Sequence, residues 1–177
     1  MKVATLKTFV ISAAFLAAAA ISVRAAENLH DDAQATIQAF MQKDPALEKF
    51  METSAGYAVF PNITEGGFIV GGAHGDGLVY QNGKPVGEAT VTKASIGAQA
   101  GGQSFAEIIF FQTPEALQQF KASNFELSAG ISGVVAGSGA AQTAAYQQGV
   151  AVFTLPKKGL MGQAAIGGQK FKFKPSK

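Results

Sequence analysis

The chain has 177 residues, no cysteine and a mean hydropathy of +0.17, which excludes a disulfide-stapled fold and a metal site built on thiolates. Lysine and arginine together number 14 against 12 aspartates and glutamates, but the single arginine, Arg24, lies close to the N-terminus. Because paired hydrogen bonding to phosphate or guanine edges favours arginine, we do not expect sequence-specific binding of nucleic acid.

Residues 1–25 are typical of a secretory signal. Lys2 and Lys7 precede an uncharged, mostly apolar run, Phe9–Val23, which is shorter than the ~20 residues that a spanning helix needs. Cleavage after Ala25 fits best, because cleavage after Ala26 would place Arg24 at position −3. An uncleaved membrane anchor is the alternative. We therefore expect residues 26–177 to form one domain in an extracytoplasmic space, either periplasmic or secreted, with peripheral membrane association as an option.

Two N-terminal helices are predicted from the spacing of apolar residues. Between residues 28 and 43, apolar side chains recur as they do on one helix face, at Ala33, Ile37, Phe40 and Met41. Asp44-Pro45 is typical of an N-cap followed by proline in the first turn, and it predicts a second helix that stops near Gly56. The pair is mostly acidic, so we expect it to pack on a sheet rather than lie on an anionic membrane, which is the alternative.

From Tyr57 onward the pattern is that of strands. Tyr57–Phe60 is a short strand that Pro61-Asn62 closes. Gly75-Asp76-Gly77 predicts a tight turn between two further strands, and Asn82-Gly83 predicts a second hairpin. Thr113-Pro114 opens one later helix.

The remaining strands are expected at Val86–Thr92, residues 96–100, Glu107–Phe111, Val150–Leu155 and Ala164–Phe173, with one long strand from Phe125 to Val135. Short connections between them imply antiparallel pairing. The sequence therefore predicts an α+β fold: a Gly-rich, strongly curved antiparallel sheet packed by two N-terminal helices and one later helix, with the helices covering one face.

Paired glycines recur in or beside the predicted strands, at Gly71-Gly72, Gly101-Gly102 and Gly167-Gly168. Glycine weakens the interior of a strand, so such pairs mark sharp curvature or the close approach of a backbone or ligand. Two interpretations stay open: a strongly curved sheet, and a glycine-floored groove that admits an acyl chain or head group.

The stretches that carry a family resemblance run through the whole expected domain: Ala55–Pro61, Gly66-Gly67-Phe68 with Gly71-Gly72, Gly75-Asp76-Gly77, Asn82-Gly83-Lys84 with Gly87, Gly97-Ala98-Gln99 with Gly101-Gly102-Gln103, Asn124-Phe125-Glu126, Gly159-Leu160-Met161 and Gly167–Phe171. In this order they resemble the SYLF-domain family of lipid-binding proteins. The resemblance implies a single domain that binds phospholipids, and the secreted single-domain form is similar to the bacterial branch. Some animal relatives use a basic amphipathic helix for phosphoinositides, but Asn28–Thr53 has no basic counterpart. Phosphoinositide specificity is therefore not expected. Actin binding is not expected either, because the chain is predicted to be an exported, bacterial-type protein.

No pattern for catalysis or for a cofactor emerges. The two histidines, His30 and His74, are far apart in the sequence. We interpret His74 as an exposed histidine in a turn, and a metal-binding pair of His74 with Asp76 is the alternative. There is no Gly-x-Ser-x-Gly elbow and no phosphate-binding Walker loop. Asp76, Glu88 and Glu107 could converge, but nothing in their spacing requires it. We expect a protein that is not an enzyme and holds no metal or cofactor.

The C-terminal end carries the clearest chemical pattern. Lysines alternate with Phe171 and Phe173, so one strand face is cationic and the other aromatic. We predict that these lysines contact anionic phospholipid, whereas the alternative is an edge strand that lysine guards against aggregation. The predicted lipid-binding residues are Lys157, Lys158, Lys170, Lys172, Lys174, Gly71, Gly72, Gly101, Gly102, Gly167 and Gly168.

Overall fold

The structure is a computed structural model that describes residues 27–67, 70–96, 102–122, 125–128, 130–137, 139–158 and 166–176. The predicted signal at residues 1–25 and the glycine at position 101 lie outside this range. The helical segments are residues 27–43, the short 3-10 helix η1 (Pro45–Leu47), α2 (Glu48–Thr53), α3 (Pro114–Lys121) and α4 (Ala140–Thr143). The strands are β1 (Gly56–Gly67), β2 (Val70–Gln81), β3 (Lys84–Ile96), β4 (Gly102–Phe111), β5 (Phe125–Glu126), β6 (Val134–Val135), β7 (Val150–Lys158) and β8 (Lys170–Pro175).

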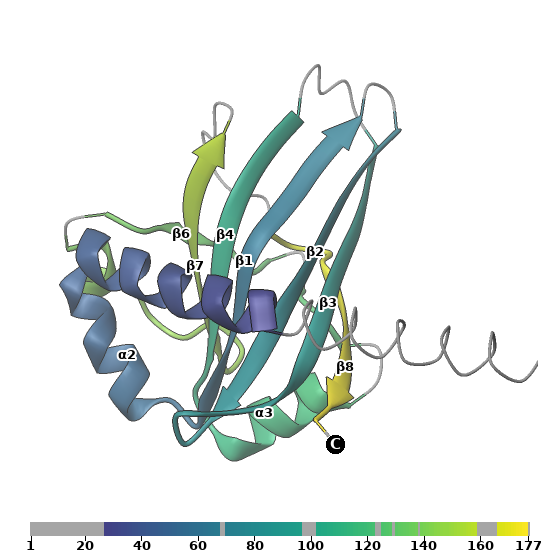
Figure 1. Ribbon diagram of the computed structural model, residues 1–177. Coiled ribbons are helices and arrows are strands. Elements are labelled where there is room, and N and C mark those ends of the chain that lie inside the picture. The colour runs from purple at the N-terminus through teal and green to yellow at the C-terminus, as the bar shows by residue number, and fades with distance from the viewer. Residues whose placement is uncertain are drawn as a thin grey trace, which may run out of the picture.

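These strands form one sheet in the order β5-β8-β3-β2-β1-β4-β7-β6 (Figure 1). Neighbouring strands run antiparallel, apart from the short pair β6 and β7, which is parallel. Two N-terminal helical segments and α3 pack against the sheet. The predicted α+β fold with a strongly curved sheet is confirmed.

The first two strands are longer than predicted. β1 continues through Pro61-Asn62 with an irregularity between Phe60 and Ile63, and β2 runs without a turn through Gly75-Asp76-Gly77. The predicted turn at Gly75–Gly77 is therefore wrong. A Cβ at Gly77 would lie 2.4 Å from the Val59 carbonyl oxygen, so this glycine permits close approach of β1 rather than chain reversal. The hairpin at Asn82-Gly83 is confirmed, with positive φ at both residues.

The predicted long strand from Phe125 to Val135 is also wrong. The chain leaves the sheet edge after β5, where the Leu127 amide donates to the Gln169 carbonyl at 3.0 Å. A turn then closes with the Ile131 amide on the Ser128 carbonyl, also at 3.0 Å. The segment thereby passes from β8 to β7, which lie near opposite edges of the sheet.

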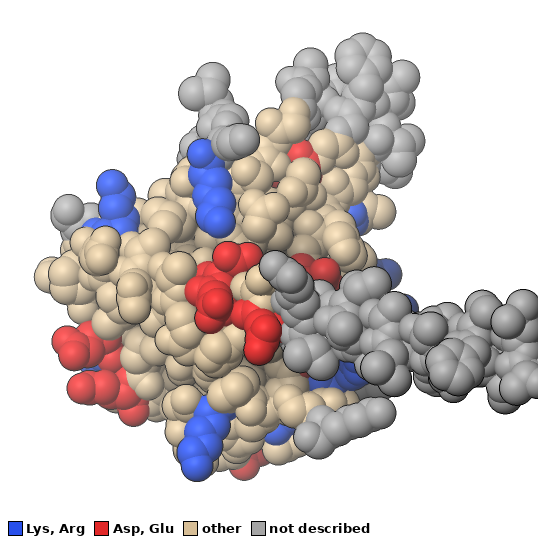
Figure 2. Space-filling view, viewed as in Figure 1, with Lys and Arg blue, Asp and Glu red and all other residues tan. Residues whose placement is uncertain are grey.

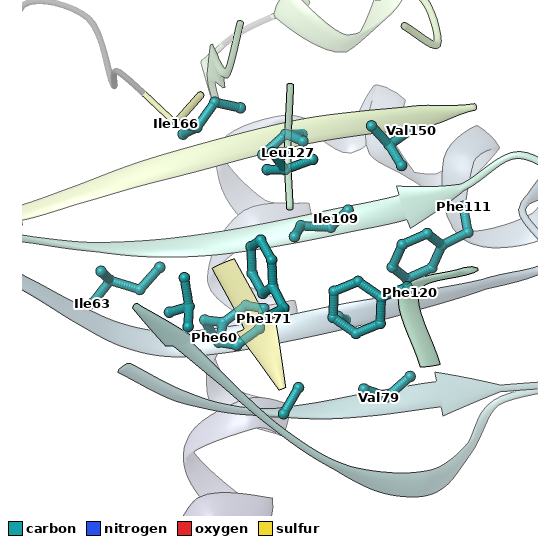
Figure 3. Close-up of a cluster of buried hydrophobic side chains, with 14 of the residues drawn as sticks. Phe60, Ile63, Val79, Ile109, Phe111, Phe120, Leu127, Val150, Ile166 and Phe171 are labelled. Atoms are coloured by element: carbon teal, nitrogen blue, oxygen red, sulfur yellow. The ribbon is translucent and has the colours of Figure 1, made fainter. Parts of the chain in front are cut away.

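The inner face of the sheet holds the larger hydrophobic cluster (Figure 3). Phe60 of β1 and Phe171 of β8 have ring centroids 5.4 Å apart, although β2 and β3 separate their strands in the sheet. This contact requires the sheet to curl around the face that carries them. Phe120 of α3 covers the cluster: its ring centroid lies 4.8 Å from that of Phe111 and 5.2 Å from that of Phe171.

The outer face carries a second hydrophobic cluster under the N-terminal helices. Phe40 and Leu47 from these helices pack with Phe110 and Phe153 of the sheet. Since α3 packs on the inner face, helices cover both faces, and the prediction that they share one face is wrong. The buried Asp44 carboxylate caps η1 through the Ala46 amide at 3.2 Å and holds α4 through the Ala141 amide at 2.8 Å.

Candidate lipid-binding surface

The β8 lysines lie as the alternation predicts. Phe171 is fully buried on the inner face, whereas Lys170, Lys172 and Lys174 are exposed on the outer face. Two of them have an acidic neighbour. Lys170 lies 3.8 Å from a Glu126 carboxylate oxygen, and Lys174 pairs in register with Glu88.

Lys172 pairs in register with Thr90, whose hydroxyl donates to Asp76 at 3.0 Å. The positive potential of the β8 row is therefore partly offset by carboxylates on the neighbouring strands.

Lys157 and Lys158 lie on β7, and four strands separate β7 from β8 in the sheet. The structure consequently does not join them to the β8 row along the sheet. Lys157 is exposed, while the backbone of Lys158 pairs with Ser104. The predicted lysines therefore lie on two separate parts of the sheet, one on β7 and the other on β8.

Glycines from three strands form a row across the outer face. Gly66 of β1 pairs in register with Gly72 of β2 on one side and with Gly102 of β4 on the other. All three are exposed. We call Gly102, Gly66 and Gly72 the glycine row. It lies beyond the part of the outer face that the N-terminal helices cover, towards the upper strand ends in Figure 1.

Two glycines of the row, Gly66 and Gly102, differ from the other strand glycines in the space around them, whereas a Cβ at Gly72 would lie 3.1 Å from the Lys93 carbonyl oxygen. A Cβ at Gly66 or Gly102 would have its nearest heavy atom at 4.0 or 3.8 Å, which is ordinary contact. A Cβ at Gly87 on the inner face would lie 2.4 Å from the Lys174 carbonyl oxygen. Curvature therefore accounts for the inner glycines, whereas the packing of the fold leaves room for side chains at Gly66 and Gly102.

The other predicted glycines are not part of this row. Gly71 pairs with Gly67 and Ser95 one residue further along the strands. Gly167 and Gly168 form the turn before β8, where Gly168 has φ +80° and its amide donates to the Leu127 carbonyl at 2.8 Å. Gly101 lies outside the described residues.

A hollow of about 410 Å³ borders the glycine row at Gly102. It is formed by β1, β4 and β7, and its lining residues are Asn62, Thr64, Gly102, Gln103, Ser104 and Lys157. We call it the β1–β4–β7 hollow. The structure thus brings together two of the predicted residues, Gly102 and Lys157, with four neutral side chains that were not among the predicted site residues: Asn62, Thr64, Gln103 and Ser104.

A larger hollow of about 680 Å³ lies between α2 and α4. Phe50 and Tyr146 line it together with Glu48, Lys49 and Glu52. The surrounding surface is acidic: Figure 2 shows red side chains gathered over the N-terminal helix and α2. None of the predicted lipid-binding residues lines this hollow.

The candidate carboxylates do not converge. Asp76 and Glu88 are exposed on the outer face, while Glu107 is fully buried on the inner face of β4. Among the described residues, no group of three histidine, aspartate or glutamate side chains is placed to hold a metal ion. His74 is exposed on β2 rather than in a turn.

Glu107 belongs to a buried polar cluster. The Gln169 side-chain amide nitrogen donates to one carboxylate oxygen of Glu107 at 3.1 Å. Thr154, on β7, pairs in register with Glu107. Within the described chain, three buried oxygens of this cluster lack a hydrogen-bond partner: Glu107 Oε1, Thr154 Oγ1 and Gln169 Oε1.

Burial raises the pKa of the Glu107 carboxyl to about 8, although the Gln169 hydrogen bond and the charge of Lys93 act against the rise. The carboxyl is then mostly protonated at neutral pH. A protonated carboxyl supplies the donor that these oxygens lack.

Comparison with known proteins finds two similarities. A family model described as Ysc84, Las17-binding protein actin regulator, matches residues 92–176. The chain is also 29% identical over 133 residues to Beta cell expansion factor A of Aeromonas veronii. Both matches support a resemblance to the SYLF family. The match with Beta cell expansion factor A covers 73% of this chain and 49% of that protein, so this chain spans about half the length of that protein.

This similarity supports a lipid-binding or actin-regulatory module. The SYLF match takes in β4, β7 and β8, and hence Gly102, Ser104, Lys157 and the β8 lysines. Asn62, Thr64 and Gly66 precede it on β1. In the described part of the chain, no helix combines the length and apolarity needed to cross a membrane.

Proposed function

We propose that this chain is an extracytoplasmic, phospholipid-binding SYLF protein that acts at the cell envelope and carries out no chemical step. The observation that carries this proposal is the open glycine row on the outer face. Exposed backbone without side chains lets a flat or extended ligand lie close to the strands. The class of ligand comes from the similarity to the SYLF family, which is associated with lipid binding.

Export is part of the proposal. It rests on the charged start and the short apolar run before Ala25. Fractionation of cells that express the full-length chain should place the protein outside the cytoplasm, and N-terminal sequencing should begin at Ala26. A cytoplasmic protein that starts at Met1 would overturn export without touching lipid binding.

Lipid binding is tested by sedimentation with vesicles. Protein purified after expression of the full-length chain should sediment with phosphatidylglycerol vesicles and less with phosphatidylcholine vesicles, and the difference should shrink as salt rises. Equal absence from both pellets would overturn the proposal. Equal binding to both would instead indicate a retained apolar N-terminal segment or purely hydrophobic contact. Native mass spectrometry of the same sample should reveal co-purified phospholipid.

A protein-interaction module is the second candidate. It is favoured by the exposed acidic side chains on the N-terminal helices, at Asp31, Asp32, Glu48 and Glu52, because such a surface suits a basic protein partner better than an anionic membrane. The family description also names a protein partner. A stoichiometric complex that forms without lipid would favour this candidate. Actin itself is not proposed, since the chain is proposed to be exported.

A further inference from the structure

The β1–β4–β7 hollow combines one cation with neutral donors. Lys157 is the charged side chain among its described lining residues, and no carboxylate is among them. The nearby Glu65 carboxylate is mostly buried and accepts a hydrogen bond from Gln103 at 2.7 Å. In this respect Lys157 differs from Lys170, which lies 3.8 Å from Glu126.

The hydroxyls of the hollow are available to an anion. Asn62 donates its side-chain amide to Thr64 Oγ1 at 3.1 Å, so the Thr64 oxygen is already an acceptor and its own hydrogen is left to donate. Ser104 lies on β4 in register with Thr64. Two hydroxyl donors and one ammonium around a common space match the oxygens of a phosphate group.

The open position at Gly102 lets a ligand reach these donors. The glycine lines the hollow, and a Cβ there would meet nothing closer than 3.8 Å. The fold would therefore accept a side chain, and the missing side chain keeps the approach from the glycine row clear. At about 410 Å³ the hollow has the size of a small-ligand site.

From these contacts we infer that the β1–β4–β7 hollow binds the phosphate of a phospholipid head group, with Lys157 as the counter-charge and Thr64 and Ser104 as hydrogen-bond donors. The inference rests on the proposed function and names the part of the outer face that holds the lipid. A single ammonium matches the single negative charge of a phosphodiester, so phosphatidylglycerol is the probe of choice.

The test compares two lysines in the vesicle assay. Lys157→Gln should weaken binding to phosphatidylglycerol vesicles about five-fold, the effect of one lysine at an anionic surface. The matched control Lys172→Gln, on the outer face of β8, should change it less than about two-fold, because carboxylates already offset that row. Equal losses in the two variants, or a larger loss in Lys172→Gln, would overturn the hollow as the phosphate site while the proposed function stands.

Substitutions that leave the charge unchanged distinguish a specific phosphate site from general electrostatic attraction to the membrane. Thr64→Val with Ser104→Ala removes the hydroxyl donors without altering charge, and Gly102→Val fills the entrance with a residue that strands favour. Both variants should lose binding while their thermal unfolding stays near that of the parent. Undiminished binding in both would show that the lipid does not enter the hollow.

A competition experiment distinguishes a lipid head group from a free phosphate ester as the ligand. Glycerol phosphate at matched ionic strength should displace the protein from vesicles only weakly, because it lacks the acyl chains that lie along the glycine row. Displacement at low concentration would instead identify a free phosphate ester as the ligand and overturn the lipid. If the parent protein binds no vesicles at all, the proposed function fails first.

Discussion

Replacement of Glu107 by glutamine removes the one ionisable group of the buried cluster on β4 and keeps its shape. The carboxyl is fully buried, and its pKa lies at about 8 in the folded chain against an ordinary value of 4.5. Each tenfold change in proton affinity corresponds to about 1.4 kcal/mol, so the rise corresponds to roughly 5 kcal/mol of unfolding free energy.

The direction follows from proton binding. Between pH 4.5 and about 8 the folded chain keeps the Glu107 proton and the unfolded chain releases it. The contribution of Glu107 is therefore fully present below pH 4.5, falls as the pH rises through this window, and is level above about pH 8. Glutamine stays neutral throughout, and its amide can donate to Gln169 Oε1 or Thr154 Oγ1, both of which lack partners in the described structure.

The assay is urea unfolding followed by circular dichroism between pH 5 and pH 9. The difference in unfolding free energy between Glu107→Gln and the parent should grow in favour of the variant by several kcal/mol across this range. Thr154→Val is the matched control, because it alters the same cluster without removing an ionisable group and should keep the parent's pH dependence. Parallel curves for parent and Glu107→Gln would refute the raised pKa and the neutral cluster.

Further substitutions test the packing of the fold. Gly77→Ala should lower the free energy of unfolding by about 1–3 kcal/mol, because its Cβ would lie 2.4 Å from the Val59 carbonyl oxygen. Gly102→Ala is the control and should change thermal stability little, so similar melting temperatures for the two variants would contradict the division into crowded and open glycines. Asp44→Ala should cost about 2 kcal/mol or more in urea unfolding, because it removes the cap of η1 and leaves the Ala141 amide unpaired in the interior. Unaltered unfolding would mean that α4 does not depend on this contact.

Local patterns in the sequence carried much of the fold. The alternation of lysine with Phe171 and Phe173 predicted the exposed and buried sides of β8, and Asn82-Gly83 marked the β2–β3 hairpin. The strand predicted from Ala164 began too early, because Gly167 and Gly168 form a turn before β8. Spacing of three to four residues placed the buried side of the N-terminal helix at Ala33 and Phe40. These signals depend on neighbours in the chain, and they were predictable for that reason.

What failed depended on partners distant in the chain. Gly75-Asp76-Gly77 has the composition of a turn. Glycine is needed at position 77 for another reason: the Phe60 ring on the neighbouring strand β1 fills the space that a Cβ at this position would occupy. The glycine row appears only when register sets Gly66 beside Gly72 and Gly102. Likewise, Glu107 and Gln169 are 62 residues apart, and no local pattern pairs them.

The most direct test of lipid binding on the outer face uses the absence of cysteine from the chain. His74→Cys introduces a single thiol for an environment-sensitive fluorophore on the outer face beside the β1–β4–β7 hollow, because residue 74 is exposed and pairs in register with Thr64. Glu52→Cys places the same probe on the acidic α2. Added phosphatidylglycerol vesicles should blue-shift the probe at position 74, and nitroxide-labelled lipid should quench it, while the probe at position 52 stays unchanged. A shift at position 52 with none at position 74, in protein that still sediments with the vesicles, would contradict this account.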